Sequence, residues 1–351
     1  MKSGKSSKLL ALLVAVPLVF AAGCGTNNAT NGAEGSGGSS SSDKKVYKIG
    51  ISQIVEHPSL NATREGFLAA LKDNGFVEKD NLEVDYQNAQ NDSSNNVTIA
   101  QKFATDKKDL VLAIATPSAQ AVVQSVKDTP ILFSAITDPV DAKLVSNLDK
   151  PGGNVTGAAD THPDAIPKLM EFIASDFPQV KTVGIVANLG EPNAATMVNT
   201  AEAELAKHNI KVQKVSVANS SEVKQAVDSL VGRVDAFYIT LDNTVVSAVE
   251  TVIKVANEKK IPFFSSDRDT VEKGALATYG FKYYDHGYQT GMMAVDILKN
   301  GKKPADMKVS YPDKLDLIIN VDAAKNQGVE ITESMKSKMQ DKNNLISGTA
   351  K

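Results

Sequence analysis

From Val46 to the C-terminus, short apolar stretches alternate with helical patterns, and this alternation limits the fold more than any other feature. Several stretches, such as LVLAIA, are apolar at nearly every position, which is typical of parallel strands covered on both faces. Between them, apolar residues recur at helical spacing, as Leu60, Phe67 and Leu71 do. Strands that alternate with helices predict βαβ units and doubly wound parallel sheets, an α/β fold. The predicted strands are residues 47–52, 82–87, 110–115, 130–136, 182–188, 211–217, 236–241, 262–266 and 275–281.

The alternation stops between Ile136 and Pro163 and is restored from Phe172 onward. This break predicts two α/β lobes joined by a connecting region. Residues 286–301 have a helical pattern, and residues 315–329 read as a strand followed by a short helix. We expect these tail elements to cross back between the lobes, so that several strands form the hinge. The predicted N-terminal lobe is residues 46–160 plus about 280–308, and the predicted C-terminal lobe is about 161–279 plus 309–345.

The start of the chain has the features of an exported lipoprotein. Three lysines precede a run of apolar residues at positions 9–22, which is shorter than the roughly 20 residues of a membrane-spanning helix and is typical of a secretory signal. The sequence AAGC that ends at Cys24, the only cysteine, resembles a lipobox. We therefore predict a signal peptide at residues 1–23 and lipid attachment at Cys24. The alternative is ordinary secretion with an incidental free thiol, which secreted proteins rarely leave unpaired.

Residues 24–45 are predicted to be a tether. They are rich in Gly, Ser and Asn and contain no Val, Leu, Ile or Phe, so we expect this segment to be disordered. A tether of this length after a lipidated cysteine favours the outer face of the membrane of a Gram-positive cell. No second apolar stretch approaches the length of a membrane span, so the lipid is the predicted membrane contact.

Charge and motifs argue against several classes of function. The formal net charge of −3 becomes −6 without the three lysines of the signal, and an acidic surface disfavours nucleic acid and anionic lipid as partners. The four histidines, at positions 57, 162, 208 and 286, lack the spacing of metal ligands. G-x-S-x-G, Walker, H-E-x-x-H and G-x-G-x-x-G motifs do not occur. We therefore predict no enzymatic activity, no cofactor and no metal.

Ligands of open α/β sheets bind beyond the carboxyl ends of the strands, so the polar residues after each predicted strand are candidates. The stretch ATPSAQ is the most informative. Thr116 suits a helix N-cap and Pro117 suits the first helical position. The amides of Ser118 and Ala119 would then be free to hold a carboxylate at the positive end of the helix dipole. The alternative is a plain cap with its amides in solvent.

Asp242 is the candidate for holding an ammonium group in the opposite lobe. It follows a predicted strand and could instead simply cap the next helix. Asp267 is a second candidate for the cation, and His57 could contact the ligand or be a polar surface residue. The predicted ligand-binding residues are His57, Pro58, Thr116, Ser118, Ala119, Gln120, Thr137, Asp138, Asn188, Asp242, Asn243 and Asp267.

Several longer segments carry a resemblance to a known family. They are IGISQIVEHPSLNATREGF, IATPSAQAV, ITDPVDAKLVSNLDKPGGNVTG, LDNTVVSAVE, KGALATYGFKYYDHGYQTGMMAVDIL and INVDAAKNQGV. With these segments the chain resembles the substrate-binding lipoproteins of ABC importers, in the branch described as binding tryptophan and tyrosine. The resemblance implies a type I periplasmic-binding-protein fold, with two Rossmann-like lobes joined by three crossovers. It also implies ligand contacts in the loop with His57 and Pro58, at 116–120, around Thr137 and Asp138, and at 242–243.

The predicted function is that of a lipid-anchored, monomeric receptor for an aromatic amino acid, which closes its lobes on the ligand and delivers it to an ABC permease. The sequence departs from the resembled family at Asn61, where the family often has Asp. One alternative is a receptor of the same fold for a sugar, although the chain has no Trp to stack on a sugar ring. A second alternative is a surface sensor that is not coupled to transport.

Overall fold

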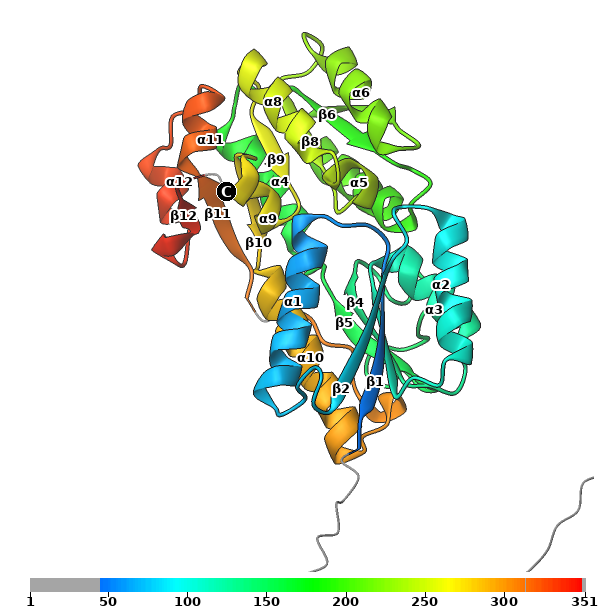
Figure 1. Ribbon diagram of the computed structural model, residues 1–351. Coiled ribbons are helices and arrows are strands. Elements are labelled where there is room, and N and C mark those ends of the chain that lie inside the picture. The colour runs from blue at the N-terminus through cyan, green and yellow to red at the C-terminus, as the bar shows by residue number, and fades with distance from the viewer. Residues whose placement is uncertain (1–44, 313, 349–351) are drawn as a thin grey trace, which may run out of the picture. The chain divides into compact units, whose positions relative to one another are not determined.

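The structure is a computed structural model that describes residues 45–312 and 314–348, and Figure 1 shows how their helices and strands are arranged. We call the first β-sheet and the helices packed on it the first lobe. Its five strands are parallel and lie in the order β2-β1-β3-β4-β5. They are β1 (Tyr47–Gln53), β2 (Leu82–Asn88), β3 (Leu110–Ile114), β4 (Ile131–Ile136) and β5 (Val155–Ala159). The helices are α1 (Pro58–Asp73), α2 (Ser93–Thr105), α3 (Thr116–Ser125) and α10 (Tyr283–Asn300).

The second lobe is built on a seven-stranded sheet, in which β10 and β11 pair antiparallel and the other pairs are parallel. Its strands, in the order β12-β11-β10-β9-β8-β6-β7, are β6 (Thr182–Ala187), β7 (Lys211–Ser216), β8 (Ala236–Ile239), β9 (Phe263–Ser265), β10 (Ala277–Gly280), β11 (Asp316–Asn320) and β12 (Leu345–Ile346). Its helices are α4 (Ala165–Asp176), α5 (Pro192–Lys207), α6 (Val223–Leu230), α7 (Asn243–Val246), α8 (Val249–Lys259), α9 (Arg268–Lys273), α11 (Val321–Asn326) and α12 (Glu333–Ser337).

Both sheets are covered on two faces, as the apolar strands predict. In the second lobe, α4 and α5 share one buried apolar cluster with the sheet, and α6, α8 and α9 share another. In the first lobe, α1 packs with α10 and α2 packs with α3. The α/β architecture with two sheets is therefore confirmed.

The chain passes between the two sheets three times within the described residues. It leaves the first sheet after β5, returns from β10 to α10, and leaves again before β11 (Figure 1). Ser310 forms a bridge with Ala158 beside the first sheet just before the last crossing. The lobe limits given above stay a prediction.

Strand β5 was not expected, because residues 136–163 showed no clear strand–helix rhythm. Its sequence, VTGAA, has only two β-branched residues, at its start, and ends in three small ones with no aromatic side chain. Gly157 has φ +158, and a Cβ there would lie 2.1 Å from the Phe133 carbonyl oxygen. The register between β4 and β5 also shifts between Phe133 and Ile136. A glycine in a strand marks such a close approach, so β5 pairs where a larger residue could not.

Helices α1 and α10 touch along glycines. A Cβ on Gly66 would lie 2.0 Å from the Tyr284 carbonyl oxygen, and one on Gly287 would lie 1.9 Å from the Thr63 carbonyl oxygen. The two backbones therefore approach more closely than any side chain would allow. This contact fixes the start of α1 relative to the crossing that leads into α10.

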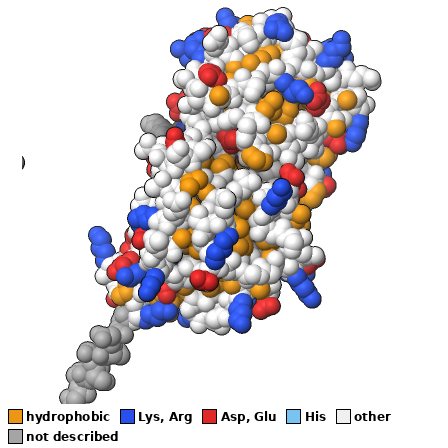
Figure 2. Space-filling view, turned by 90° about the vertical axis from the view of Figure 1, so that its right-hand side faces the viewer, with side chains coloured by type: hydrophobic (Ala, Val, Ile, Leu, Met, Phe, Trp, Pro, Cys, Tyr) orange, Lys and Arg blue, Asp and Glu red, His pale blue; other side chains and the backbone are white. Residues whose placement is uncertain are grey.

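On the face shown in Figure 2, basic and acidic side chains are interspersed among apolar ones. The predicted signal peptide, Cys24 and nearly all of the predicted tether lie outside the described residues. Within residues 45–312 and 314–348, no helix has both the length and the apolar character needed to span a membrane.

Candidate functional site

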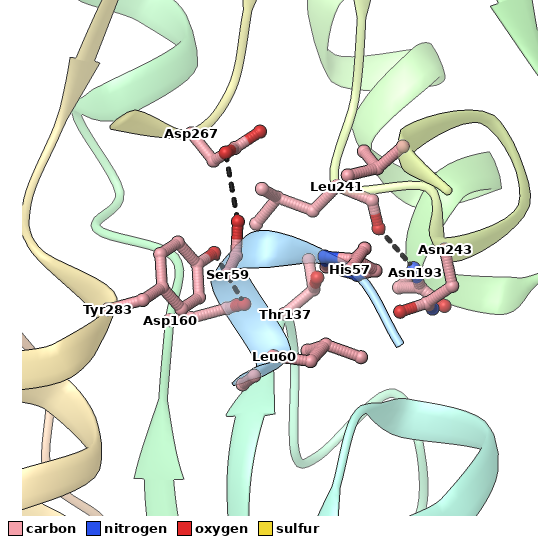
Figure 3. A pocket seen from close by; sticks show the side chains of 12 residues that line it. His57, Ser59, Leu60, Thr137, Asp160, Asn193, Leu241, Asn243, Asp267 and Tyr283 are labelled. Atoms are coloured by element: carbon pink, nitrogen blue, oxygen red, sulfur yellow. Dashed lines mark hydrogen bonds between the residues drawn. The ribbon is translucent and has the colours of Figure 1, made fainter. Parts of the chain in front are cut away.

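A small cavity lies between the two lobes, beyond the carboxyl ends of their strands (Figure 3). Its volume is about 20 Å³, which is room for one or two water molecules. An amino acid with a ring side chain therefore enters only when the lobes separate or lining side chains turn. The lining residues are His57, Ser59, Leu60, Ala135, Thr137, Asp160, Asn193, Leu241, Asn243, Val246, Asp267 and Tyr283.

The N-terminus of α1 forms one wall of the cavity. His57 stands at the N-cap but makes no side-chain capping bond, and Pro58 is the first helical residue. The first amide to reach an acceptor within the helix is that of Asn61, which donates to the His57 carbonyl oxygen at 3.0 Å. The amides of Ser59 and Leu60, in the first turn, have no intrahelical acceptor. Together with the dipole of a long helix they form an anion-binding wall.

Asp267 of the second lobe faces this wall, as Figure 3 shows. Its side chain is buried, and Oδ1 accepts hydrogen bonds from Ser59 Oγ at 2.9 Å and from the Thr270 amide at 2.7 Å. Oδ2 accepts one from Ser265 Oγ at 2.9 Å. A carboxylate has about four acceptor sites. Asp267 therefore keeps room for about one further donor.

Asp160 and Tyr283 come from two of the segments that cross between the lobes. Tyr283 Oη donates to Asp160 Oδ2 at 3.0 Å. Burial raises the pKa of Asp160 to about 6, although the bond from Tyr283 opposes the rise. The twelve lining residues include no Lys or Arg. The two carboxylates of the cavity therefore face no Lys or Arg in its lining, and the cavity favours a cation next to Asp160 and Asp267.

His57, Asn193 and Asn243 form the polar wall opposite Asp160. Burial lowers the pKa of His57 to about 4, so the imidazole is neutral at pH 7. Asn193 donates from Nδ2 to the Leu241 carbonyl oxygen at 2.7 Å. Within the described residues, His57 Nδ1 and Asn193 Oδ1 are buried without a hydrogen-bond partner. A buried polar atom without a hydrogen-bond partner destabilises the fold unless a ligand or a water molecule supplies the partner. Both atoms belong to residues that line the cavity.

A second small cavity, of about 10 Å³, adjoins the first and shares Asp160 and Leu241 with it. Its lining is mostly apolar and includes rings. Leu241 packs against the cores of both lobes, so its side chain stands, together with Asp160, where the polar chamber adjoins the apolar one. The other lining residues of the second cavity are Thr161, Ala165, Ile166, Leu169, Met197, Ser266, Tyr279, Phe281 and Leu315.

Of the residues predicted from the sequence, the structure places His57, Thr137, Asn243 and Asp267 in the lining of the first cavity. Pro58 begins α1 and lines a groove beside the cavity, together with Asn61. The Asn61 side chain accepts a hydrogen bond from Gln53 Nε2 at 2.9 Å. The position at which the chain departs from the resembled family therefore lies beside the cavity, outside its lining.

The residues at 116–120 do not line either cavity. Thr116 is the first residue of α3, and the N-cap position is Ala115, with φ +76. The amide of Ala119 donates to the Ala115 carbonyl oxygen at 3.0 Å, so the prediction that this amide is unpaired is wrong. Ser118 Oγ donates to Asn96 of α2 at 3.1 Å, and Gln120 Nε2 donates to the Ala142 carbonyl oxygen at 3.2 Å.

Three other predicted residues, Asp138, Asn188 and Asp242, make hydrogen bonds within the protein that account for their positions without a ligand. Asp138 is exposed, and its Oδ1 accepts from two backbone amides of the following turn. Asp242 is buried and caps α7, with Oδ1 accepting from the Val245 amide at 2.8 Å and Oδ2 accepting from the Asn188 amide. Burial, and next the charge of Glu191, raise the pKa of Asp242 to about 7. The plain-cap alternative for Asp242 fits these contacts.

Several lining residues were not selected from the sequence: Ser59, Leu60, Ala135, Asp160, Asn193, Leu241, Val246 and Tyr283. One signal was available for the first two. His57-Pro58 has the same proline at the first helical position that drew attention to Thr116-Pro117. Asp160 and Tyr283 carried no such signal, because they meet only through the crossings between the lobes.

With the geometry established, comparisons with known proteins identify the family. Residues 48–342 match the family described as ABC transporter substrate binding protein. The chain belongs to this family. It is thus an extracellular substrate-binding protein of an ABC transporter, and its family is one of binding proteins rather than enzymes.

Relatives of this substrate-binding protein include a protein of Clostridioides difficile named tyrosine-binding protein, which is 43% identical over 92% of each chain. A solved structure from Streptococcus pneumoniae, described as an ABC domain in complex with L-Trp, is 35% identical with a TM-score of 0.79 and covers 84% of this chain and 99% of its own. The ligand-free, open structure of a Clostridium difficile substrate-binding protein with adhesive properties is 44% identical with a TM-score of 0.64, covering 87% of this chain and 100% of its own.

The two solved structures rank differently by sequence and by shape. The open structure is the more identical in sequence, yet the L-Trp complex superposes better. The lobes of the substrate-binding protein described here are therefore placed more nearly as in the L-Trp complex. Their direct contacts agree with a closed arrangement of the type I periplasmic-binding-protein fold.

Proposed function

We propose that this substrate-binding protein binds an aromatic amino acid between its lobes. The carboxylate of the ligand would bind the amides of Ser59 and Leu60 at the start of α1. The ammonium group would bind Asp267 and Asp160. The ring would extend past Leu241 into the apolar chamber, once this side chain turns aside.

The observation that supports this proposal most is the pairing of opposite charges across the cavity. A helix N-terminus with unpaired amides lies in the first lobe, and a buried carboxylate with room for one more donor lies in the second. A zwitterion satisfies both walls and thereby links the lobes. A neutral sugar has no charge to place against Asp160 and Asp267, which disfavours the sugar alternative.

Ring recognition is supported by the second chamber. Tyr279, Phe281, Leu169 and Met197 line it, and apolar and ring side chains are typical of ligand pockets. The relatives named for tyrosine and described with L-Trp bind ligands of this class. We infer that the same class binds here.

We further propose that the protein acts at the outer face of the cell membrane, anchored by a lipid on Cys24, and passes its ligand as a monomer to an ABC permease. Closure of the lobes around the ligand would present the form that the permease recognises. The sensor alternative shares every feature of the site. It differs only in the partner of the closed form.

A thermal-shift screen of residues 45–351 against the twenty amino acids and common sugars tests the ligand class. A ligand at a hundredfold excess over its Kd adds about 2.7 kcal/mol of stability, or roughly 4 °C in a chain of this size. A rise confined to Trp, Tyr and Phe supports the proposal. A rise with sugars only, or with amino acids that lack a ring, contradicts it.

Tryptophan offers a direct second measurement. The chain contains no Trp, so the fluorescence of bound L-Trp reports binding without background from the protein. N-acetyl-tryptophan and tryptophan amide serve as matched probes. The first removes the ammonium charge and the second removes the carboxylate. Both should bind at least tenfold more weakly if both walls are used.

A further inference from the structure

A hydrogen bond between the lobes lies outside the ligand cavity. Asn91, in the loop between β2 and α2, donates from Nδ2 to Thr244 Oγ1 of α7 at 2.8 Å. Neither residue lines the ligand cavity. Among the described residues, the other hydrogen bonds that join the lobes differ from it: Ser59–Asp267 and the long Thr137 Oγ1–Met197 Sδ contact of 4.0 Å involve residues that line the two cavities, and Thr196–Asp141 lies at an exposed edge.

The Asn91 side is held in place by the first lobe alone. Gln90 and Asn91 both have left-handed backbone, with φ +55 and +58, a conformation that Asn tolerates better than most residues. The Asn91 amide donates to the Ile54 carbonyl oxygen at 2.7 Å, and the Ala89 amide donates to the Gln53 carbonyl oxygen at 2.9 Å. The loop is therefore set without help from the second lobe.

The Thr244 side is held in place by the second lobe alone. Thr244 is fully buried, and its hydroxyl donates to Glu191 Oε1 at 2.7 Å and accepts from Asn188 Nδ2 at 3.0 Å. Glu191 also accepts from the backbone amides of Asn243 and Thr244 and from Asn243 Nδ2. A hydroxyl has one donor and two acceptor sites, so one acceptor site of Thr244 is left for the other lobe.

We propose that Asn91 is a positioning residue that stabilises the closed lobes by filling the last acceptor site of Thr244. The two groups are set in advance in separate lobes, so their bond forms on closure and breaks on opening. The proposal rests on lobe closure as the mode of binding, which is part of the proposed function. It does not depend on which ligand is bound.

The consequence for binding follows from population arithmetic. When closure accompanies binding, the apparent Kd rises as the closed form becomes rarer. One net hydrogen bond changes such an equilibrium by about 2- to 10-fold. Asn91→Ala should therefore weaken every ligand by one common factor in this range, leaving the ratios between ligands unchanged, because Asn91 touches none of them.

The matched control is Gln90→Ala. Gln90 is exposed, belongs to the same left-handed turn, and within the described residues its side chain makes no hydrogen bond. Gln90→Ala should leave affinity unchanged. Asn91→Asp keeps the size of the side chain but places a carboxylate, which can only accept, against Thr244 Oγ1. The hydroxyl proton of Thr244 is already donated to Glu191, so no hydrogen bond can form between the two. Asn91→Asp should weaken binding more than Asn91→Ala does.

The test uses single-molecule fluorescence transfer between dyes at Gln124 and Gln225, exposed positions of α3 and α6, each changed to Cys in a Cys24→Ser chain. With Asn91→Ala, the ligand-free ratio of closed to open molecules should fall by about 2- to 10-fold, whereas Gln90→Ala, in the same left-handed turn, should leave this ratio unchanged. An unchanged closed fraction overturns the proposal, as does a change in the ratios of ligand affinities. Because this measurement needs no ligand, it still decides the matter if the proposed ligand class is wrong.

Discussion

Replacing Asp267 by Asn tests the assignment of the ammonium site most directly. Three donors already bond the carboxylate, from Ser59, Ser265 and Thr270, which leaves room for about one bond from a ligand. A single hydrogen bond to a charged group contributes about 1.5–3 kcal/mol. Asp267→Asn should therefore raise the Kd of L-Trp by about 10- to 150-fold.

The fold should survive this substitution. Asn is as good an N-cap as Asp, so the bond from the Thr270 amide is retained, and we expect a loss of about 1 kcal/mol from one serine hydroxyl left without its acceptor. Titration of Trp fluorescence gives the Kd, and urea unfolding gives the stability.

Asp242→Asn is the matched control. Both of its carboxylate oxygens accept backbone amides, so the variant should lose about 1–3 kcal/mol of stability while its affinity changes less than about threefold. Equal losses of affinity in the two variants, or no loss for Asp267→Asn, would refute the assignment.

Three further predictions follow from the same contacts. Burial raises the pKa of Asp160 to about 6, above the unfolded value of about 3.9; its contribution to stability is therefore complete below about pH 4 and is lost as the pH rises through 6. The ammonium group of a ligand favours the ionised form of Asp160, so the affinity for the ligand should rise between pH 5 and 7. In Asp160→Asn, both the stability and the ligand affinity should depend less on pH. Leu241→Ala should join the two chambers and thereby raise the affinity for the ligand L-Trp relative to that for the ligand L-alanine, as measured by competition. An unchanged ratio of these two affinities would show that Leu241 does not separate the chambers. Gly66→Ala places a Cβ 2.0 Å from the Tyr284 carbonyl oxygen and should cost about 3 kcal/mol or more in urea unfolding; Ala62→Gly, on the same helix, should cost only about 1 kcal/mol.

The sheets could be predicted because their strands carry the pattern themselves. LVLAI and ILFSAI are apolar at nearly every position, and both form buried strands close to their predicted limits. Strand β5 escaped prediction because its pairing depends on a close backbone approach at Gly157. Such an approach leaves no periodic signal in the sequence.

The site was predicted less well, for a physical reason. A residue such as Asp242 looks the same in the sequence whether its carboxylate faces a ligand or the amides of its own lobe. Only the fold shows that Val245 and Asn188 occupy both of its oxygens. Asp160 and Tyr283 lie 123 positions apart, and their contact arises from the crossings between the lobes. By contrast, Asp267 directly follows the predicted strand 262–266, and His57 lies in the loop after the predicted strand 47–52, so both could be found.

The return of the chain to the first lobe has a consequence for the order of folding. Helix α10 covers α1, yet it is synthesised only after most of the second lobe. Until residue 300 has emerged from the ribosome, the face of α1 that carries Gly66 lacks its partner α10, and the first lobe cannot be completed. The first lobe is thus completed late in synthesis, which agrees with the signal peptide predicted at residues 1–23, since such a segment would direct the chain through the membrane before it folds.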